Sequence, residues 1–274
     1  MADLFNSAAQ QDSIITAIKA FIALPESVPD NTDYISFSNI SAVNAHAIRS
    51  AFDNDPIFDA AYARFTYDPM FGQIRIARGS PLIDVTANWL QKQEKKWKEN
   101  RAVQIFTYQN DILSYGGLEL RTFTIDTIIK TPCFCLQPWS KPFPSVVVET
   151  GYTQPLVDLE RDKEIWKNFT NGETKVVIIT KFAMTARGTV MADVWFHRPH
   201  AANGISTSSR CTIFPAPRSS QTEVFFLDLS EVYGGECPEG VDPDKILELD
   251  LTELREMCRE ELRNNELVPD SDDR

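Results

Sequence analysis

The sequence predicts an α/β protein with a mixed central sheet flanked by helices, preceded by a short N-terminal helical arm. Short apolar runs bounded by polar turns recur along the chain and indicate strands. Between them, residues such as Leu82, Val85 and Trp89 follow the spacing of one helix face. A charged helical segment also joins two apolar runs, Val146–Val148 and Val176–Ile179, which is the pattern of a strand–helix–strand unit.

Composition limits the class of protein. Of 274 residues, 43% are hydrophobic and 24% charged, so a packed core is expected. The net charge of −12 argues against extensive nucleic-acid binding, although a local basic groove is compatible with it. The odd number of cysteines, five, favours reduced thiols and an intracellular location, cytoplasmic or nuclear. No apolar run approaches the ~18 residues of a membrane span, so we expect no membrane contact.

The first 58 residues are predicted to form the helical arm. Asp12–Leu24 carries an apolar stripe at helical spacing and is followed by a proline-containing linker, Pro25–Asp33. Ile40–Phe52 is predicted as a second helix with Ser41 as its N-cap. We expect this arm to dock on the main domain or on a partner.

The main domain, residues 59–265, begins with a hairpin and a helix. Arg64–Tyr67 and Gln73–Ala77 are predicted to pair around a five-residue turn. A helix is expected to follow, with Ser80 as cap and Pro81 as its first residue. Its lysine-rich end, Gln91–Asn100, is typical of a solvated helix face, and a DNA-contacting stripe is the alternative.

Later segments complete the predicted sheet. The predicted strands are Val103–Tyr108, Leu118–Phe123, Thr131–Leu136, Ser145–Glu149, Lys175–Phe182, Val190–His197, Glu223–Asp228 and Lys245–Leu251. Ala201–Ser220 is rich in Ser, Pro and Asn and predicts a long loop. Thr252–Asn264 predicts an amphipathic acidic helix, and residues 266–274 a disordered tail.

The strand–helix–strand unit carries the most informative ionisable groups. The run Val146–Val148 ends on Glu149, and the helix that follows, about Leu156–Phe169, carries Lys163. Ligand and metal sites in α/β sheets tend to lie where strands end. A plain salt bridge between Glu149 and Lys163 is the simpler alternative, and Lys163 is equally compatible with an ordinary solvated helix position.

In this pattern the chain resembles the PD-(D/E)XK restriction-endonuclease-like proteins, in particular a branch of putative restriction endonucleases common in bacteria and expanded in fungi. The hairpin and first helix correspond to Arg64–Trp97, the Pro-Asp strand to Pro132–Cys133, and the Glu strand to Pro144–Glu149. The catalytic lysine, which this branch carries on the following helix, falls on Lys163, and Lys175–Lys181 is the closing strand.

The resemblance implies a restriction-endonuclease-like fold and Mg²⁺- or Mn²⁺-dependent hydrolysis of DNA phosphodiesters. Glu149 would hold the metal, helped by Asp84 and by the backbone carbonyl of Thr150. Lys163 would orient or polarise the attacking water and stabilise charge on phosphorus.

Two positions depart from the family pattern. Cys133 stands where the family has its metal-binding Asp, and a thiolate is a poor ligand for Mg²⁺. Gly151 stands where the usual third motif has Lys, so that Lys163 is left to replace it.

Two functions from different classes therefore remain open. The first is a nuclease-like protein with a partly degenerate site that contacts DNA through a local groove. The second is a catalytically inactive nuclease fold that serves as a binding or protein-interaction module, a class that Cys133 and the acidic net charge favour. The acidic helix Thr252–Asn264 is a candidate surface for a protein partner. The sequence carries no signal for the oligomeric state.

Overall fold

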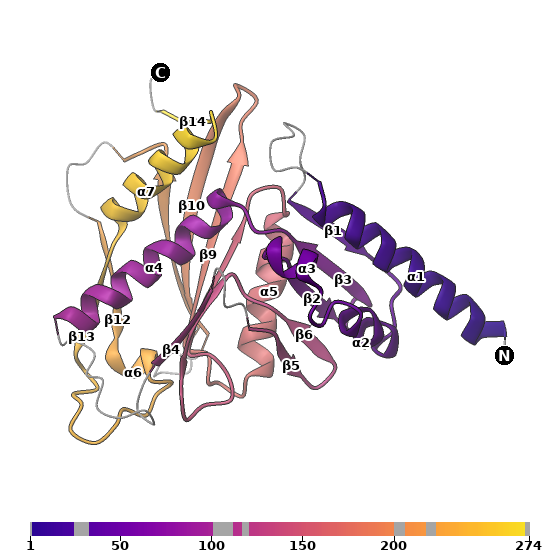
Figure 1. Ribbon diagram of the computed structural model, residues 1–274. Coiled ribbons are helices and arrows are strands. Elements are labelled where there is room, and N and C mark those ends of the chain that lie inside the picture. Colours follow the sequence, from indigo (N-terminus) through magenta and orange to yellow (C-terminus); the bar gives the residue numbers. More distant parts are fainter. Residues whose placement is uncertain are drawn as a thin grey trace. The chain divides into compact units, whose positions relative to one another are not determined.

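The computed structural model is an α/β protein (Figure 1) and describes residues 2–24, 33–100, 112–116, 121–199, 206–217 and 223–271. The chain divides into two compact units. Unit 1 comprises Met1–Ser80 and Leu118–Pro132, and unit 2 comprises Pro81–Gly117 and Cys133–Arg274. This division does not follow the expected boundary between residues 58 and 59, because the hairpin of residues 64–77 shares its sheet with strands on both sides of that boundary.

Unit 1 packs helices on a five-stranded antiparallel sheet of order β1-β3-β2-β6-β5. Its helices are α1 (Ala2–Ile22), α2 (Ala42–Ser50) and α3 (Pro56–Ala60). Its strands are β1 (Tyr34–Phe37), β2 (Arg64–Asp68), β3 (Gln73–Ala77), β5 (Phe123–Ile125) and β6 (Ile128–Lys130). Ile18 and Ile22 of α1 join Phe65 and Ile74 of the sheet in one apolar core.

Two predictions for unit 1 are confirmed. The hairpin β2–β3 forms, although its first strand extends by one residue into the expected turn, so that Asp68 pairs with Gln73. Ser41 caps α2, since its side chain accepts a hydrogen bond from the backbone amide of Asn44 at 3.3 Å.

Unit 2 is built on a seven-stranded mixed sheet. Its main path has the order β11-β10-β9-β8-β7-β4, and β14 pairs with β10. The strands are β4 (Ile112–Gly116), β7 (Phe134–Pro138), β8 (Val146–Gly151), β9 (Val176–Met184), β10 (Thr189–Arg198), β11 (Thr207–Phe214) and β14 (Val268–Pro269). Along the main path only β8 and β9 run parallel. A separate two-stranded sheet joins β12 (Val224–Asp228) to β13 (Ile246–Asp250).

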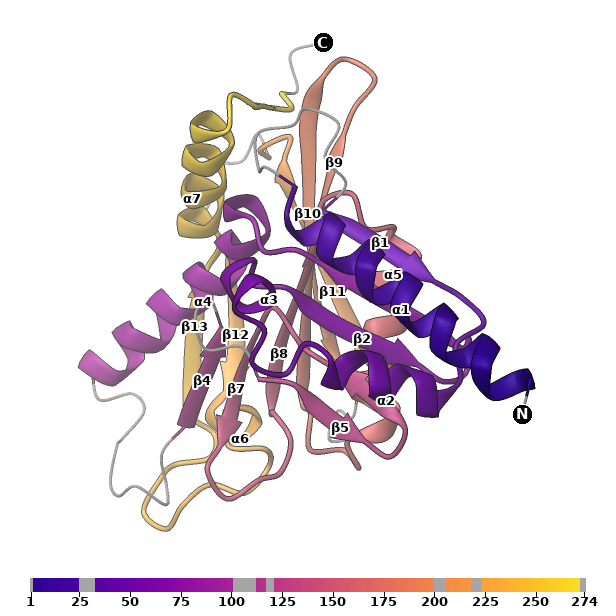
Figure 2. The same cartoon turned by 45° about the vertical axis from the view of Figure 1, so that its right-hand side comes forward.

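Helices cover both faces of the unit 2 sheet (Figure 2). They are α4 (Pro81–Glu99), α5 (Leu156–Phe169), α6 (Leu229–Val232) and α7 (Leu251–Asn264). On one face, α4 and α7 pack together, and Trp89 and Leu254 share a core with Val146 and Val148. On the other face, α5 packs on β8 and β9. Successive residues of β8 therefore face different helix layers, because neighbouring side chains of a strand point to opposite faces.

Several predictions for the C-terminal half need correction. The loop expected over Ala201–Ser220 contains β11, whose side chains at residues 207–210 are exposed, as suits a polar edge strand. Within the tail expected to be disordered, Val268 and Pro269 form β14. The Asp270 amide donates to the Val190 carbonyl at 2.8 Å, and the Asp270 carboxylate accepts from Arg187 and Thr189. These polar contacts order a segment of low hydrophobicity. The strand predicted over 103–108 lies outside the described residues, as does the first half of the one predicted over 118–123.

The predicted helix over 252–264 and the strand over 245–251 are confirmed as α7 and β13. Within the part of the chain that the structure describes, no helix combines the length and the apolar character needed to cross a bilayer.

Candidate functional site

The strand–helix–strand unit forms as predicted and orders the end of β8. Val146, Val147 and Val148 are fully buried, which is typical of a strand covered on both faces. At the end of α5, Asn171 and Gly172 both have positive φ, at 53° and 75°, which lets the chain turn directly into β9. The crossover thus places the last residues of β8 beside β9 and beneath α5.

Glu149 lies at this strand end and points towards α5. Its neighbour Val148 faces the α4 core, so the Glu149 side chain faces the opposite layer. There Glu149 is only 3% exposed, and one of its carboxylate oxygens accepts a hydrogen bond from the indole N–H of Trp166 at 2.7 Å. The chain therefore buries an acidic side chain and supplies a donor from α5 to hold it.

Cys133 lies next to the same strand end. Its backbone amide donates to the Val148 carbonyl at 3.1 Å. Its sulfur accepts a hydrogen bond from the Thr150 amide at 3.2 Å, and the thiol lies 3.7 Å from the Thr150 carbonyl oxygen. The structure therefore places Cys133 against the backbone of Val148 and Thr150, the two residues that flank Glu149.

Lys163 has carboxylate neighbours on its own helix. Its ammonium contacts Glu160 and lies 3.3 Å from Glu164. Burial lowers the pKa of Lys163, but the two carboxylates outweigh it and raise the pKa above its usual range. Lys163 is therefore a firmly protonated cation.

The same helix face approaches His197 of β10. His197 Nε2 lies 4.0 Å from a Glu160 carboxylate oxygen. Burial, and then the positive charge of Lys163, lower the pKa of His197. Lys163 therefore lies close enough to β10 to affect the protonation of His197.

Asp84 belongs to the other layer. It lies in the first turn of α4, whose neighbouring residues Leu82 and Val85 join the core on the Val148 face of the sheet. The predicted metal ligands thus come from helices and strands that serve two different faces.

Lys181 of β9 was not singled out from the sequence. The parallel register places Ile179 beside Glu149 and Lys181 beside Gly151. The ammonium of Lys181 donates to the backbone carbonyl of Tyr152, just beyond the end of β8. In the sequence, Lys181 is recognisable by its place just after the apolar run Val176–Ile179 of the closing strand.

Gly151 occupies a tightly packed position at the end of β8. A Cβ atom at this position would lie 3.0 Å from Cβ of Gln154 and 3.3 Å from Cδ1 of Leu159. A side chain at this position, where the resemblance expects lysine, would therefore require Gln154 and Leu159 to shift.

The donor set does not fit Mg²⁺ or Mn²⁺. These ions prefer several converging oxygen ligands, whereas Cys133 offers sulfur and its thiol contacts the Thr150 carbonyl. Trp166 already occupies one oxygen of Glu149. Across the described ranges, no group of three or more His, Cys, Asp or Glu side chains has the geometry to hold a metal ion.

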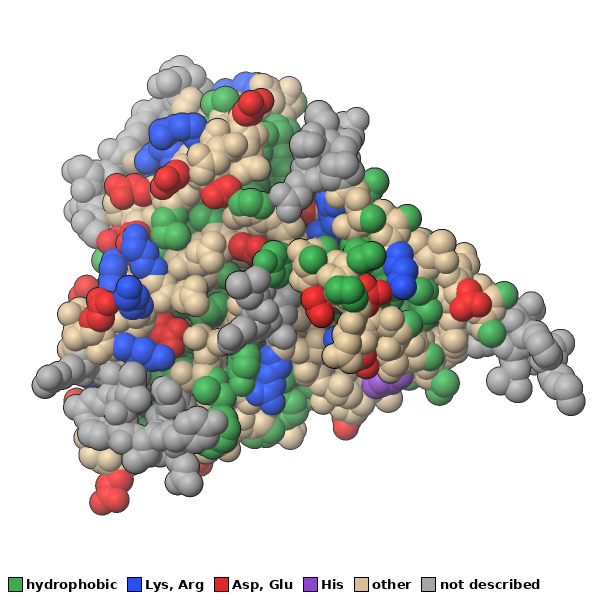
Figure 3. Space-filling model, in the orientation of Figure 1, with side chains coloured by type: hydrophobic (Ala, Val, Ile, Leu, Met, Phe, Trp, Pro, Cys, Tyr) green, Lys and Arg blue, Asp and Glu red, His purple; other side chains and the backbone are tan. Residues whose placement is uncertain are grey.

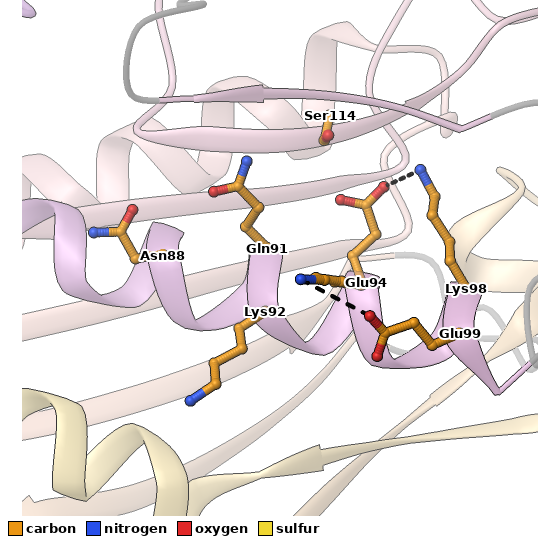
Figure 4. A pocket seen from close by; sticks show the side chains of 8 residues that line it. Asn88, Gln91, Lys92, Glu94, Lys98, Glu99 and Ser114 are labelled. Atoms are coloured by element: carbon orange, nitrogen blue, oxygen red, sulfur yellow. Dashed lines mark ion pairs between the residues drawn. The ribbon is translucent and has the colours of Figure 1, made fainter.

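A groove of about 440 Å³ lies between α4 and β4, lined in part by Gln91, Glu94 and Ser114. In Figure 4, Gln91 and Glu94 point towards Ser114, and Glu94 forms an ion pair with Lys98 at 2.8 Å. The groove belongs to the α4 layer, whereas Glu149 faces the α5 layer.

The lysines of α4 are matched by acids. Lys92 and Lys96 both contact Glu253 of α7, at 2.7 and 2.6 Å, and Lys95 lies 3.8 Å from Glu99. In Figure 3 blue and red side chains are intermingled over this region. This arrangement favours the solvated helix face over the DNA-contacting stripe.

Comparison with known proteins gives no family: no family model matches the chain, and no curated protein matches it significantly.

Proposed function

We propose that unit 2 is a nuclease-like domain of the PD-(D/E)XK type that keeps the fold and the glutamate but does not bind the catalytic metal, and that it acts as a non-catalytic interaction module. The order of its elements supports the fold proposal. Helix α4, the strand that follows Pro132–Cys133, the strand that ends on Glu149, the helix with Lys163 and the closing strand β9 succeed one another as the resemblance requires.

One observation supports the proposed loss of catalysis. At the position where the resemblance expects a metal-binding Asp, the Cys133 sulfur contacts both the amide and the carbonyl of Thr150. A carboxylate at this position would offer hard oxygens, whereas the thiol uses the backbone that would otherwise help to ligate the ion. The net charge of −12 favours a protein partner over DNA.

Plasmid nicking by the full chain in Mg²⁺ or Mn²⁺ tests this proposal. We expect the wild type and Cys133→Ser to leave the plasmid intact, whereas Cys133→Asp gains nicking and binds Mn²⁺ in calorimetry. The double variant Cys133→Asp with Glu149→Gln should lose both gains, which excludes a contaminating nuclease.

A second function is favoured by the position of Glu149. It is a buried carboxylate at the end of a parallel strand, with lysines on both the following helix and the neighbouring strand. Such an arrangement suits metal-dependent hydrolysis of DNA phosphodiesters. Nicking by the wild type that Glu149→Gln abolishes would establish this function and overturn the first.

A further inference from the structure

The two-stranded sheet of β12 and β13, called the ribbon below, has an outer face of mixed character. Leu227, Leu247 and Leu249 point into the core of unit 2, so the residues that alternate with them point outwards. The outward positions hold three apolar and three acidic side chains: Val224, Phe226, Ile246, Asp228, Glu248 and Asp250. Outward positions of an antiparallel sheet are ordinarily polar, so the apolar half of this face calls for a physical reason.

The apolar side chains of the outer face lie next to one another. Phe226 is 49% exposed and Ile246 is 56% exposed. Phe226 lies opposite Glu248 and Ile246 lies opposite Asp228, so that the two apolar side chains are diagonal neighbours. Single exposed apolar residues are common, whereas a group of them rimmed by charges is typical of a contact surface.

A groove of about 340 Å³ runs between this face and α4. The ribbon contributes Val224, Ile246 and Glu248 to its lining, and α4 contributes Lys96 and Trp97 among others. Figure 1 shows β13 beside α4, with which it is in contact. Two neighbouring strands present a face about 10 Å wide, which matches the diameter of one α-helix. The ribbon and α4 thus form the floor and one wall of a groove of helix width.

Both backbone edges of the ribbon are already engaged by side chains. On β12, the Phe226 carbonyl accepts a hydrogen bond from the Arg198 guanidinium. On β13, two carbonyls accept from the indole N–H groups of Trp97 and Trp89, at 3.1 and 2.8 Å. A strand added to either edge would have to break these bonds. A partner segment is therefore expected to pack on the side chains of the face, as a helix in a groove does.

The charge of this region selects the partner further. Lys96 lines the groove, but its ammonium and that of Lys92 both contact Glu253, at 2.6 and 2.7 Å. Four carboxylates therefore face two ammonium groups: Asp228, Glu248, Asp250 and Glu253 against Lys92 and Lys96. An acidic surface attracts a basic partner and repels a second copy of a chain with a net charge of −12.

We infer that the groove between the ribbon and α4 binds a basic amphipathic helix of a partner protein. Apolar side chains of that helix cover Phe226 and Ile246, and its Lys or Arg side chains meet Glu248 and the neighbouring carboxylates. This inference rests on the proposed role as an interaction module and deepens it, because it names the surface and the chemistry of the partner.

Fluorescence anisotropy on the full chain tests the inference with a labelled peptide of about 14 residues, which has leucines along one helix face and lysines elsewhere. The control peptide has glutamates in place of the lysines. We expect the lysine peptide to bind and the glutamate peptide not to bind. Ile246→Ser should weaken binding of the lysine peptide about tenfold, and Glu248→Gln by a smaller factor that shrinks with added salt.

Two matched variants control for general effects of polarity and charge. Val157 of α5 is 57% exposed, almost as Ile246 is, but it belongs to the other helix layer of unit 2. Glu266 is exposed just beyond the end of α7. Val157→Ser and Glu266→Gln should leave the affinity for the lysine peptide unchanged.

The possible outcomes separate this inference from the proposed loss of catalysis. Absence of binding by the lysine peptide, equal binding of both peptides, or equal weakening by the ribbon variants and their controls would overturn the docking site. None of these results depends on the plasmid assay, and nicking by the wild type would overturn only the loss of catalysis. Because Ile246 is exposed, Ile246→Ser should keep the wild-type urea midpoint, and if it does not, Phe226→Ser repeats the test from the other strand.

Discussion

The two faces of the unit 2 sheet differ in the kinds of side chains that they bury. The face under α4 and α7 has a core of aliphatic and aromatic side chains, and the α4 charges are paired near the surface, as between Lys92 and Glu253. The face under α5 buries polar groups, among them Glu149 and Asp162. Asp162 accepts from the Gln154 amide at 3.2 Å, as Glu149 does from Trp166 at 2.7 Å. Both faces bury apolar side chains, such as Val147 and Leu159 on the α5 face, so the difference lies in the carboxylates that the α5 face also buries near the end of β8.

The largest effect is expected on the apolar face. Trp89 is fully buried, and its indole N–H donates to the Asp250 carbonyl at 2.8 Å. Trp89→Ala should lower the free energy of unfolding by about 3–5 kcal/mol, because it opens a cavity in the core. Urea denaturation measures this loss, and a cost below about 1 kcal/mol would contradict the assignment of this face as the main core.

The two buried tryptophans compare the faces directly. Trp166→Phe and Trp89→Phe each remove one indole donor from a fully buried ring, but the first acceptor is a carboxylate and the second a backbone carbonyl. Hydrogen bonds to charged groups contribute about 1.5–3 kcal/mol and neutral ones about 0.5–1.5 kcal/mol. We expect Trp166→Phe to cost more in urea denaturation. Equal costs would remove the distinction between the layers.

Gly151 tests how tightly the turn into α5 closes over the strand end. Gly151→Ala should cost about 1–2 kcal/mol, because its Cβ would lie 3.0 Å from Cβ of Gln154. Gln154→Gly removes that atom, so the double variant should lose less stability than the two single changes together. A neutral Gly151→Ala variant would show that the turn yields easily.

The smallest effect concerns the paired charges between α4 and α7. Burial alone would raise the pKa of Glu253, but hydrogen bonds from Lys92, Lys96 and Gln93 lower it to about 2. Because the folded pKa lies below the unfolded one, the stabilisation is present above the unfolded value of about 4.3 and is lost as the pH falls towards 2. Solvent screening limits it to about 1 kcal/mol.

Glu253→Gln should therefore flatten the stability profile between pH 4.5 and 2 and reduce its dependence on salt. Unfolding midpoints measured across this range provide the check. An unchanged acid slope would show that other carboxylates dominate the profile.

Local pattern predicted the elements whose signal is contained in one segment. The hairpin of residues 64–77, the crossover from Val146 to Ile179 and the amphipathic helix α7 were all predictable from periodicity and turn residues. The position of Cys133 beside the strand that carries Glu149 followed from the strand order that the resemblance implies. These features depend on spacing along the chain.

Features that depend on pairing between distant segments were missed. The position of Lys181 near the end of β8 depends on the register of β8 and β9, which sets it beside Gly151. The polar strand β11 has little apolar alternation and is defined by its partner β10. Similarly, β5 and β6 join the sheet of unit 1 although they lie more than 40 residues beyond β3 in the sequence. No local pattern predicts this pairing.

The Asp270 contacts have a consequence for biosynthesis. Arg187 lies in the turn between β9 and β10, and Thr189 is the first residue of β10, yet the carboxylate that both of them bind lies 83 and 81 residues later. During synthesis on a ribosome the hairpin emerges first, and it lacks the hydrogen bonds to Asp270 until residue 270 has left the exit tunnel. Emergence of residue 270, rather than hairpin formation, then sets the moment at which this edge of the sheet acquires its final strength.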